Sequence, residues 1–331
     1  MHDTIIVRYA EIALKGKNRA DFEKRLVENI RATLKNLRIG FQKIIRKRGR
    51  ILIATDSKAD ELRYVPGIAS FSYALTAMPS MDSIIKASER LIQDKEFTSF
   101  RVSAKRIDKS AELNSNEVNI RLGEHIRSRY SKKVSLNGYD LDIGVELIDR
   151  HEYIFTEKIA GYGGLPIGST GRVLVVLDSK RSLYAAKLMM KRGCRVILIS
   201  GTAEISQTAK ETAKISQTEK TGQAKEKKHN NDMNDMNYID VTELERYNNY
   251  ERLNVISPYA AGNQCKDTKQ KGFSDMLREN KASAVVVSNS SDELHELGVL
   301  FKNNRDVLIL APLICTSRDD VGKITSKEYK I

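Results

Sequence analysis

Apolar positions over the first 77 residues switch between strand spacing and helix spacing. A short run rich in β-branched residues opens the chain, and a stretch follows in which apolar residues recur every three or four positions. Two further apolar runs flank the turn KRGR at 47–50, which predicts a basic hairpin. The order β-α-β-β-α-β is that of a ferredoxin-like fold. The predicted strands are Thr4–Arg8, Phe41–Ile45, Ile51–Ala54 and Phe71–Thr76, and the predicted helices are Arg19–Leu37 and Asp60–Tyr64.

A second α+β part is predicted at 78–162. Ile84, Ile85, Leu91 and Ile92 lie at helical spacing, and Phe100–Ile107 alternates as a strand. Asn114, with Glu117 three residues later, resembles a capping box that opens a helix to Tyr130. The last two strands, Leu141–Ile148 and Tyr153–Lys158, predict a hairpin around Asp149–Glu152.

The third part, 163–331, alternates strands and helices. Gly161–Gly171 is rich in glycine and predicts a connection. Continuous apolar runs indicate strands that are buried on both faces, so we expect a doubly wound parallel sheet. Residues 202–237 are poor in large apolar side chains and predict a disordered insertion. The expected strands are Val173–Leu177, Arg195–Ser200, Leu253–Ile256, Ala284–Val287 and Val307–Leu310, and Ser182–Arg192 is a helix that Gly193 ends.

Charge adds a candidate function. The chain of 331 residues has a formal net charge of +13, and the first 50 residues hold fourteen Lys or Arg against five Asp or Glu. Such a density of positive charge favours the binding of polyanions, although a basic face that contacts only solvent would have the same composition. The three cysteines form no CxxC pair and the histidines show no ligand spacing, so we expect no structural metal and a reducing cytoplasm. No apolar run is long enough to span a membrane.

Three stretches resemble the tRNA 4-thiouridine synthetases (tRNA sulfurtransferases), in an archaeal-type form. They are RYAEIALKGKNRADFEKRLVENI at 8–30, FRVSAKRIDKSAELNSNEVNIRLGEHI at 100–126, and YIFTEKIAGYGGLPIGSTGRVLVVL at 153–177 followed by LMMKRGCRV. The resemblance implies a ferredoxin-like domain (1–77), a THUMP domain (78–162) and a Rossmann-like PP-loop ATPase-type domain (163–331). It also implies that the first two domains bind the acceptor end of tRNA, by shape and phosphate contacts. The candidate contacts are Arg101, Lys105, Arg106 and Lys109, then Arg46, Lys47, Arg48 and Arg50 on the basic hairpin.

The family's nucleotide loop, SGGxDS, is degenerate here. Its positions hold Leu177, Asp178, Ser179, Lys180, Arg181 and Ser182, so both glycines are lost. Side chains obstruct the close backbone approach that glycines allow. A nucleotide-site remnant is expected at Val176, Leu177, Asp178, Ser179 and Ser182. The resemblance implies ATP and Mg²⁺ as cofactors only if this site works.

Two further departures concern nucleotide and sulfur. The strand end VVVSNSSDELHEL at 285–297 lacks the family's glycine and glutamine, and no residue matches the family's sulfur-carrying cysteine. No catalytic residue is therefore assigned, and Cys315 is better explained as a structural thiol. The leading hypothesis is a tRNA-binding member with lost or impaired catalysis. An active enzyme that receives persulfide from a sulfur-donor protein is the alternative, and a scaffold without RNA is a third reading. A homodimer fits the resemblance.

Overall fold

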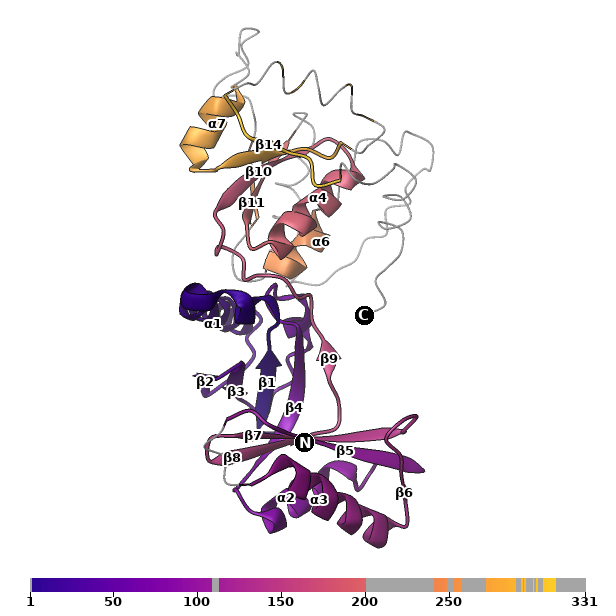
Figure 1. Ribbon diagram of the computed structural model, residues 1–331. Coiled ribbons are helices and arrows are strands. Elements are labelled where there is room, and N and C mark those ends of the chain that lie inside the picture. Colours follow the sequence, from indigo (N-terminus) through magenta and orange to yellow (C-terminus); the bar gives the residue numbers. More distant parts are fainter. Residues whose placement is uncertain are drawn as a thin grey trace, which may run out of the picture. The chain divides into compact units, whose positions relative to one another are not determined.

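The structure is a computed structural model that describes most of the first 200 residues and parts of the remainder (Figure 1). The described residues are 2–108, 113–200, 241–248, 253–256, 272–289, 293, 295, 300, 302 and 306–313. The chain divides into two compact units, Met1–Pro166 and Ile167–Ile331. Lys109 and the insertion predicted at 202–237 lie outside the described residues, as do Cys265 and Cys315.

The first half of unit 1 is ferredoxin-like, as predicted. Its antiparallel strands lie in the order β2-β3-β1-β4, and α1 packs on one face through Leu26, Ile30 and Leu34. Fully buried aliphatic side chains on this face give the half its own core. The elements are β1 (Thr4–Arg8), α1 (Arg19–Asn36), β2 (Lys43–Lys47), β3 (Arg50–Ala54), a 3-10 turn at Asp60–Tyr64, and β4 (Ser70–Ala77).

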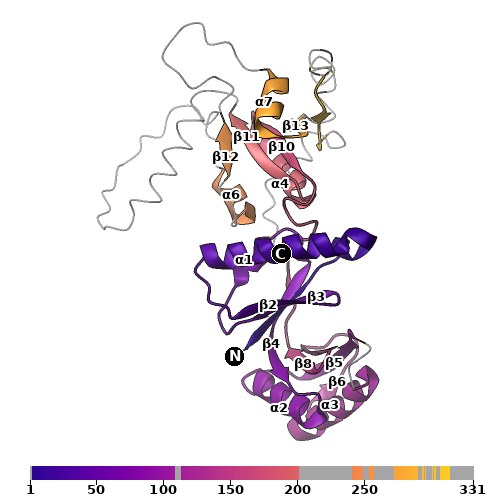
Figure 2. The same cartoon turned by 90° about the vertical axis from the view of Figure 1, so that its left-hand side faces the viewer.

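The second half of unit 1 is a sheet with two helices on one face. Helices α2 and α3 contact each other and the strands beneath them, and together they enclose a core around Phe100, Leu122 and Ile143 (Figure 2). β5 and β7 are parallel neighbours, whereas β7 and β8 form an antiparallel hairpin. The elements are α2 (Met81–Ile92), β5 (Ser99–Arg106), α3 (Ser115–Tyr130), β6 (Lys133–Val134), β7 (Leu141–Ile148), β8 (His151–Phe155) and β9 (Ile159–Ala160).

Two hairpins are tighter than the sequence predicted. In the basic hairpin Lys47 pairs with Arg50, so only Arg48 and Gly49 form the turn, and Gly49 takes a φ of 73°. In the second hairpin Ile148 pairs with His151, so β8 begins two residues before the predicted strand. Asp149 supplies the left-handed conformation there, with a φ of 59°. In each hairpin one central residue takes a positive φ, and the register of the paired strands sets the two-residue length of the turn.

Other sequence predictions need smaller corrections. Asn114 caps α3 as expected, but its side chain accepts from the backbone N–H of Asn116, and Glu117 pairs with Arg121 instead of closing a capping box. Strand β9 was not predicted, because two residues carry no periodic signal; it pairs with β4.

The two halves of unit 1 share one continuous sheet. β4 pairs with β1 through residues 70–74 and with β8 through Leu75–Ala77. The faces that carry no helix meet there and bury Ile6, Leu52, Tyr153 and Phe155. Backbone hydrogen bonds and an apolar contact therefore join the two halves.

Unit 2 contains a parallel sheet in the order β12-β11-β10-β13-β14, as the doubly wound prediction requires. The order of strands reverses at β10, and α4 follows β10 directly, beginning two residues before the predicted helix. Ligands of doubly wound sheets bind at the carboxyl ends of strands beside such a reversal. The elements are β10 (Arg172–Leu177), α4 (Lys180–Lys191), β11 (Arg195–Ser200), α6 (Thr242–Glu245), β12 (Asn254–Ile256), α7 (Phe273–Asn280), β13 (Ala284–Val286) and β14 (Ile309–Leu310).

Candidate functional site

Cations from three strand ends gather at one edge of unit 1, here called the basic edge. The Lys47 ammonium of the β2–β3 hairpin donates to the Asp149 carboxylate in the β7–β8 turn at 2.8 Å. The end of β5 lies beside the same turn, because Arg106 pairs in register with Leu147. Segments about 100 residues apart in the sequence thus present charge together. The basic edge consists of Arg46, Lys47, Arg48, Lys105, Arg106 and Arg150.

Most side chains of the basic edge lie at the surface. Arg46, Arg48, Lys105, Arg106 and Arg150 are exposed. Asp149 and Asp108 are acidic residues close to these cations, and the neighbouring Lys47 lowers the pKa of the Asp149 carboxyl. Exposed cations in a fixed array attract a polyanion and release its counterions on binding.

The start of α1 extends the basic edge, a contribution that was not predicted from the sequence. Arg46 donates to the backbone carbonyl of Ala20 at 3.3 Å. Arg19 donates to Glu23 at 2.7 Å, while Lys17 is exposed in the turn before the helix. These residues belong to the KGKNR segment, so the signal was present in the first motif that carried the family resemblance.

Arg101 lies at the other end of β5, away from the basic edge. Its guanidinium donates to Asp142 at 2.8 Å and lies 4.1 Å from the centre of the Tyr139 ring. Because five residues of strand span about 16 Å, Arg101 and Arg106 do not form one patch. The structure therefore divides the predicted contacts on β5 into two groups.

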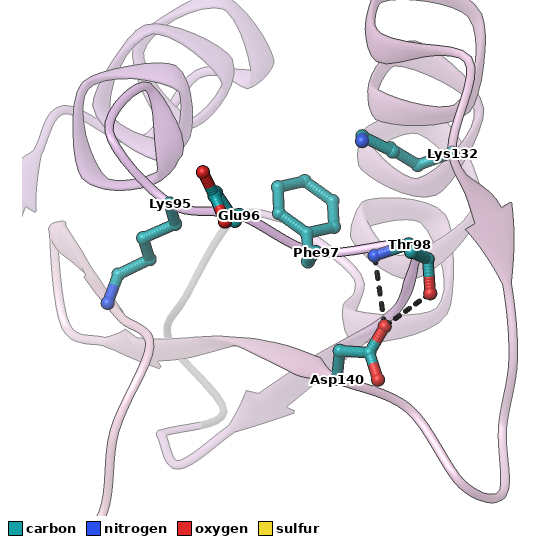
Figure 3. Close-up of a pocket in the computed structure, with 6 residues that line it drawn as sticks. All are labelled: Lys95, Glu96, Phe97, Thr98, Lys132 and Asp140. Carbon is teal, nitrogen blue, oxygen red and sulfur yellow. Dashed lines mark hydrogen bonds between the residues drawn. The ribbon is translucent and has the colours of Figure 1, made fainter.

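A hollow of about 510 Å³ lies near this second group (Figure 3). Lys95 and Lys132 contribute charge to it, and Phe97 forms part of its wall. One oxygen of Asp140 accepts hydrogen bonds from the backbone and hydroxyl groups of Thr98 and Ser99, which hold the pKa of its carboxyl well below its ordinary value. Asp140 thus ties β7 to the start of β5 and is unsuited to act as a general acid.

Arg50 differs from the other predicted contacts, because it is largely buried. It donates to both oxygens of Glu146 on β7, at 2.5 and 3.0 Å. Glu146 also accepts from Arg8 at 2.8 Å, so one carboxylate bridges two arginines. Burial raises the pKa of Glu146, but the two guanidinium groups outweigh it and hold that pKa below its usual value. Arg50 therefore belongs to a buried cluster of charges and is not part of the exposed basic edge.

The nucleotide-site remnant lies at the start of α4, and a carboxylate of the chain fills it. One oxygen of Asp178 accepts from the hydroxyls of Ser179, Ser182 and Ser288, at 2.9, 2.7 and 2.6 Å. The Ser182 hydroxyl in turn accepts the backbone N–H groups of Asp178 and Ser179. A helix N-terminus beside parallel strand ends is a usual phosphate site. Here the three serine hydroxyls and the backbone N–H groups of Asp178 and Ser179 are already engaged, and an incoming phosphate would meet the like charge of Asp178.

Other side chains near the start of α4 are also paired or buried within the protein. Arg181, at the position of the motif's acidic residue, donates twice to Glu293 at 3.0 and 2.8 Å. Val176 and Leu177 pack in the sheet and offer only backbone to a ligand. Cys194 is buried, and burial raises the pKa of its thiol, so it holds little thiolate at neutral pH.

The described residues offer no candidate for a membrane span or for a metal site. No helix among them is long and apolar enough to cross a bilayer. No three histidine, cysteine or acidic side chains in this part of the chain gather to hold a metal ion.

Comparison with known proteins identifies the parts. The ThiI ferredoxin-like domain matches residues 4–72, the THUMP domain matches 79–157, and the thiamine biosynthesis protein (ThiI) family matches 168–328. This order defines a THUMP-containing protein with a parallel α/β third part. With nearly the whole chain covered by the three matches, the protein belongs to the tRNA sulfurtransferase family.

Individual relatives agree with this placement. A probable tRNA sulfurtransferase of Thermococcus kodakarensis is 39% identical over 208 residues, which cover 60% of this chain and 55% of that protein. The chain spans about half the length of the first curated relatives that it matches. The crystal structure of PH1313 from Pyrococcus horikoshii Ot3 is 28% identical, with a TM-score of 0.77 and coverage of 97% of this chain and 98% of that one.

A second solved structure extends the comparison of the fold. It is a 4-thiouridine synthetase–RNA complex with bound ATP, 21% identical, with a TM-score of 0.73 and coverage of 98% and 84%. At that identity the likeness concerns the fold alone. The predicted fold class, an α+β half followed by a Rossmann-like α/β domain, is confirmed.

Proposed function

We propose that unit 1 binds the acceptor end of tRNA and that the protein takes part in tRNA modification by the 4-thiouridine pathway. The observation that carries the proposal is the basic edge, where Arg46, Arg48, Lys105 and Arg106 are exposed on strands that a salt bridge holds together. A rigid array of cations suits an RNA backbone, whose phosphates are regularly spaced. The family membership supplies the RNA class.

Binding of a labelled RNA hairpin with an acceptor-stem sequence and a single-stranded 3′ end tests this proposal. We expect log Kd to rise linearly with log salt, with a slope of about 3 to 5 if four to six phosphates are contacted. Fluorescence anisotropy between 50 and 300 mM salt measures the slope. Absence of binding at 50 mM salt, or a flat dependence, would contradict the proposal and favour a scaffold without RNA.

The second part of the proposal is that ATP-dependent catalysis is lost or impaired. It is supported by Asp178, which brings a negative charge to the start of α4 and engages the hydroxyls of Ser179, Ser182 and Ser288. Desolvating a phosphate beside an uncompensated carboxylate is unfavourable. Cys194 adds no reactive thiolate.

We expect 5 mM ATP with Mg²⁺ to leave the melting temperature unchanged, because a ligand that does not bind the folded state cannot stabilise it. Differential scanning fluorimetry makes the measurement. Asp178→Asn is the matched variant, since it keeps the shape and removes the charge, and its affinity for ATP should exceed that of the natural chain. Clear stabilisation of the natural chain by ATP would refute the proposed impairment.

An active tRNA sulfurtransferase is the second candidate, because curated relatives have that name. It would require persulfide from a sulfur-donor protein. Incubation with ATP, such a donor and unmodified tRNA distinguishes the two, by mass spectrometry of nucleosides. Many turnovers of 4-thiouridine per protein molecule would favour the enzyme, and none would favour the RNA-binding member.

A further inference from the structure

A buried cluster of three charges joins the two halves of unit 1, close to the basic edge. Arg8 comes from β1, Arg50 from β3 and Glu146 from β7, so the cluster crosses from the ferredoxin-like half to the THUMP half. The exposed fractions of the three side chains are 10%, 13% and 4%. One carboxylate thus serves two guanidinium groups away from solvent.

The contacts of this cluster fix the orientation of the two arginine side chains. Arg50 approaches Glu146 in a bidentate fashion, and Arg8 donates a second bond to the Ser72 hydroxyl at 2.9 Å. The Phe155 ring lies 4.7 Å from the Arg8 guanidinium and covers it. Bidentate arginine–carboxylate pairs fix orientation as well as distance, which a lysine could not do.

The location of Arg50 gives the cluster a consequence at the surface. Arg50 directly follows the Arg48–Gly49 turn, and it pairs in register with Lys47. Lys105 stands opposite Glu146 on the neighbouring strand. Fixing the Arg50–Glu146 pair therefore fixes the spacing between the cations of the hairpin and those at the end of β5.

We propose that Glu146 is a positioning residue for RNA binding, which sets the spacing of the two cation groups of the basic edge through Arg50 and Arg8. This inference rests on the proposed binding of acceptor-stem RNA. It reassigns Arg50 from a direct phosphate contact to a residue that acts through Glu146. An apolar replacement could hold the halves together equally well, but it would not hold this register.

The test compares the natural chain with Glu146→Gln, using the labelled RNA hairpin described above. At 10 °C and 0.1 M salt we expect binding at least ten-fold weaker, with a salt slope lower by about one to two, because hairpin cations no longer meet phosphates together. Amide hydrogen exchange of residues 43–50 should become faster, while that of α1 stays unchanged. A folded variant with unchanged Kd, slope and exchange would overturn the inference.

Glu293→Gln is the matched control. Glu293 is equally buried and accepts twice from Arg181, but it lies in unit 2. The Glu293→Gln variant should be less stable than the natural chain, but its affinity for the RNA should be unchanged. If Glu146→Gln does not fold, Arg50→Lys replaces it, because the charges stay paired and only the bidentate geometry is lost; about three-fold weaker binding is then expected, and unchanged binding overturns the inference.

Failure of the inference and failure of the proposed function are distinguishable. If the natural chain does not bind the RNA, the proposed function fails and the effect of Glu146 on binding fails with it. If the natural chain binds and both cluster variants bind as tightly, only the inference fails.

Discussion

Replacing Arg46 and Arg48 together by alanine is expected to weaken binding of acceptor-stem RNA about 25- to 60-fold at 0.1 M salt. Each cation that neutralises a phosphate contributes about 0.7 to 0.9 to the salt slope, so the double variant should also lower the slope by about 1.5 to 2. Both side chains are exposed, so the fold should tolerate their loss. Anisotropy titrations at four salt concentrations give both quantities.

The matched control is Arg127→Ala with Arg129→Ala. These two arginines are also exposed and in unit 1, but they lie in the last turn of α3, toward the opposite end of β5. The change in net charge is identical. An equal loss of affinity in the control would mean that total charge, and not the basic edge, determines binding.

Gly144→Ala is expected to lower the free energy of unfolding of unit 1 by about 2–3 kcal/mol. A Cβ at this position would lie 2.3 Å from Cε2 of Phe155, which is itself buried in the contact between the two halves. The ring would have to move, and its place over Arg8 would be lost. Urea unfolding followed by circular dichroism measures the change.

Gly123→Ala provides a control of opposite sign. Gly123 lies within α3, and an added Cβ would meet only Cγ2 of Val102, at 4.0 Å. Alanine in a helix reduces the entropy lost on folding, so a gain of about 0.5–1 kcal/mol is expected. Destabilisation by both changes, or by neither, would show that the contact with Phe155 is not the cause. Phe155→Leu should partly rescue Gly144→Ala.

The sequence predicted the elements of unit 1 well, because each carries a local period. The helix from Arg19 and the strand at Thr4–Arg8 are found with almost the predicted bounds. The turn lengths were less accessible, since a two-residue turn at Asp149 depends on pairing between strands and not on composition.

At the candidate site, contacts between residues that are far apart in the sequence could not be predicted. Arg48 and Arg50 look alike in the KRGR turn, yet one is exposed and the other is buried against Glu146, 96 residues away. No local pattern encodes such a partner. The loss of the glycines at the start of α4 was visible in the sequence, but the hydrogen bond from Ser288 to Asp178 joins residues 110 positions apart.

Strand β4 has a consequence for how this protein can be divided. The matched ferredoxin-like domain ends at residue 72 and the THUMP domain begins at 79, so the boundary falls within or next to Ser70–Ala77. One end of this strand pairs with β1 of the ferredoxin-like half, and the other end pairs with β8 of the THUMP half. A gene fragment cut at either limit would leave an open sheet edge, which invites aggregation. The two domains thus match separate sequence families but form a single module for expression.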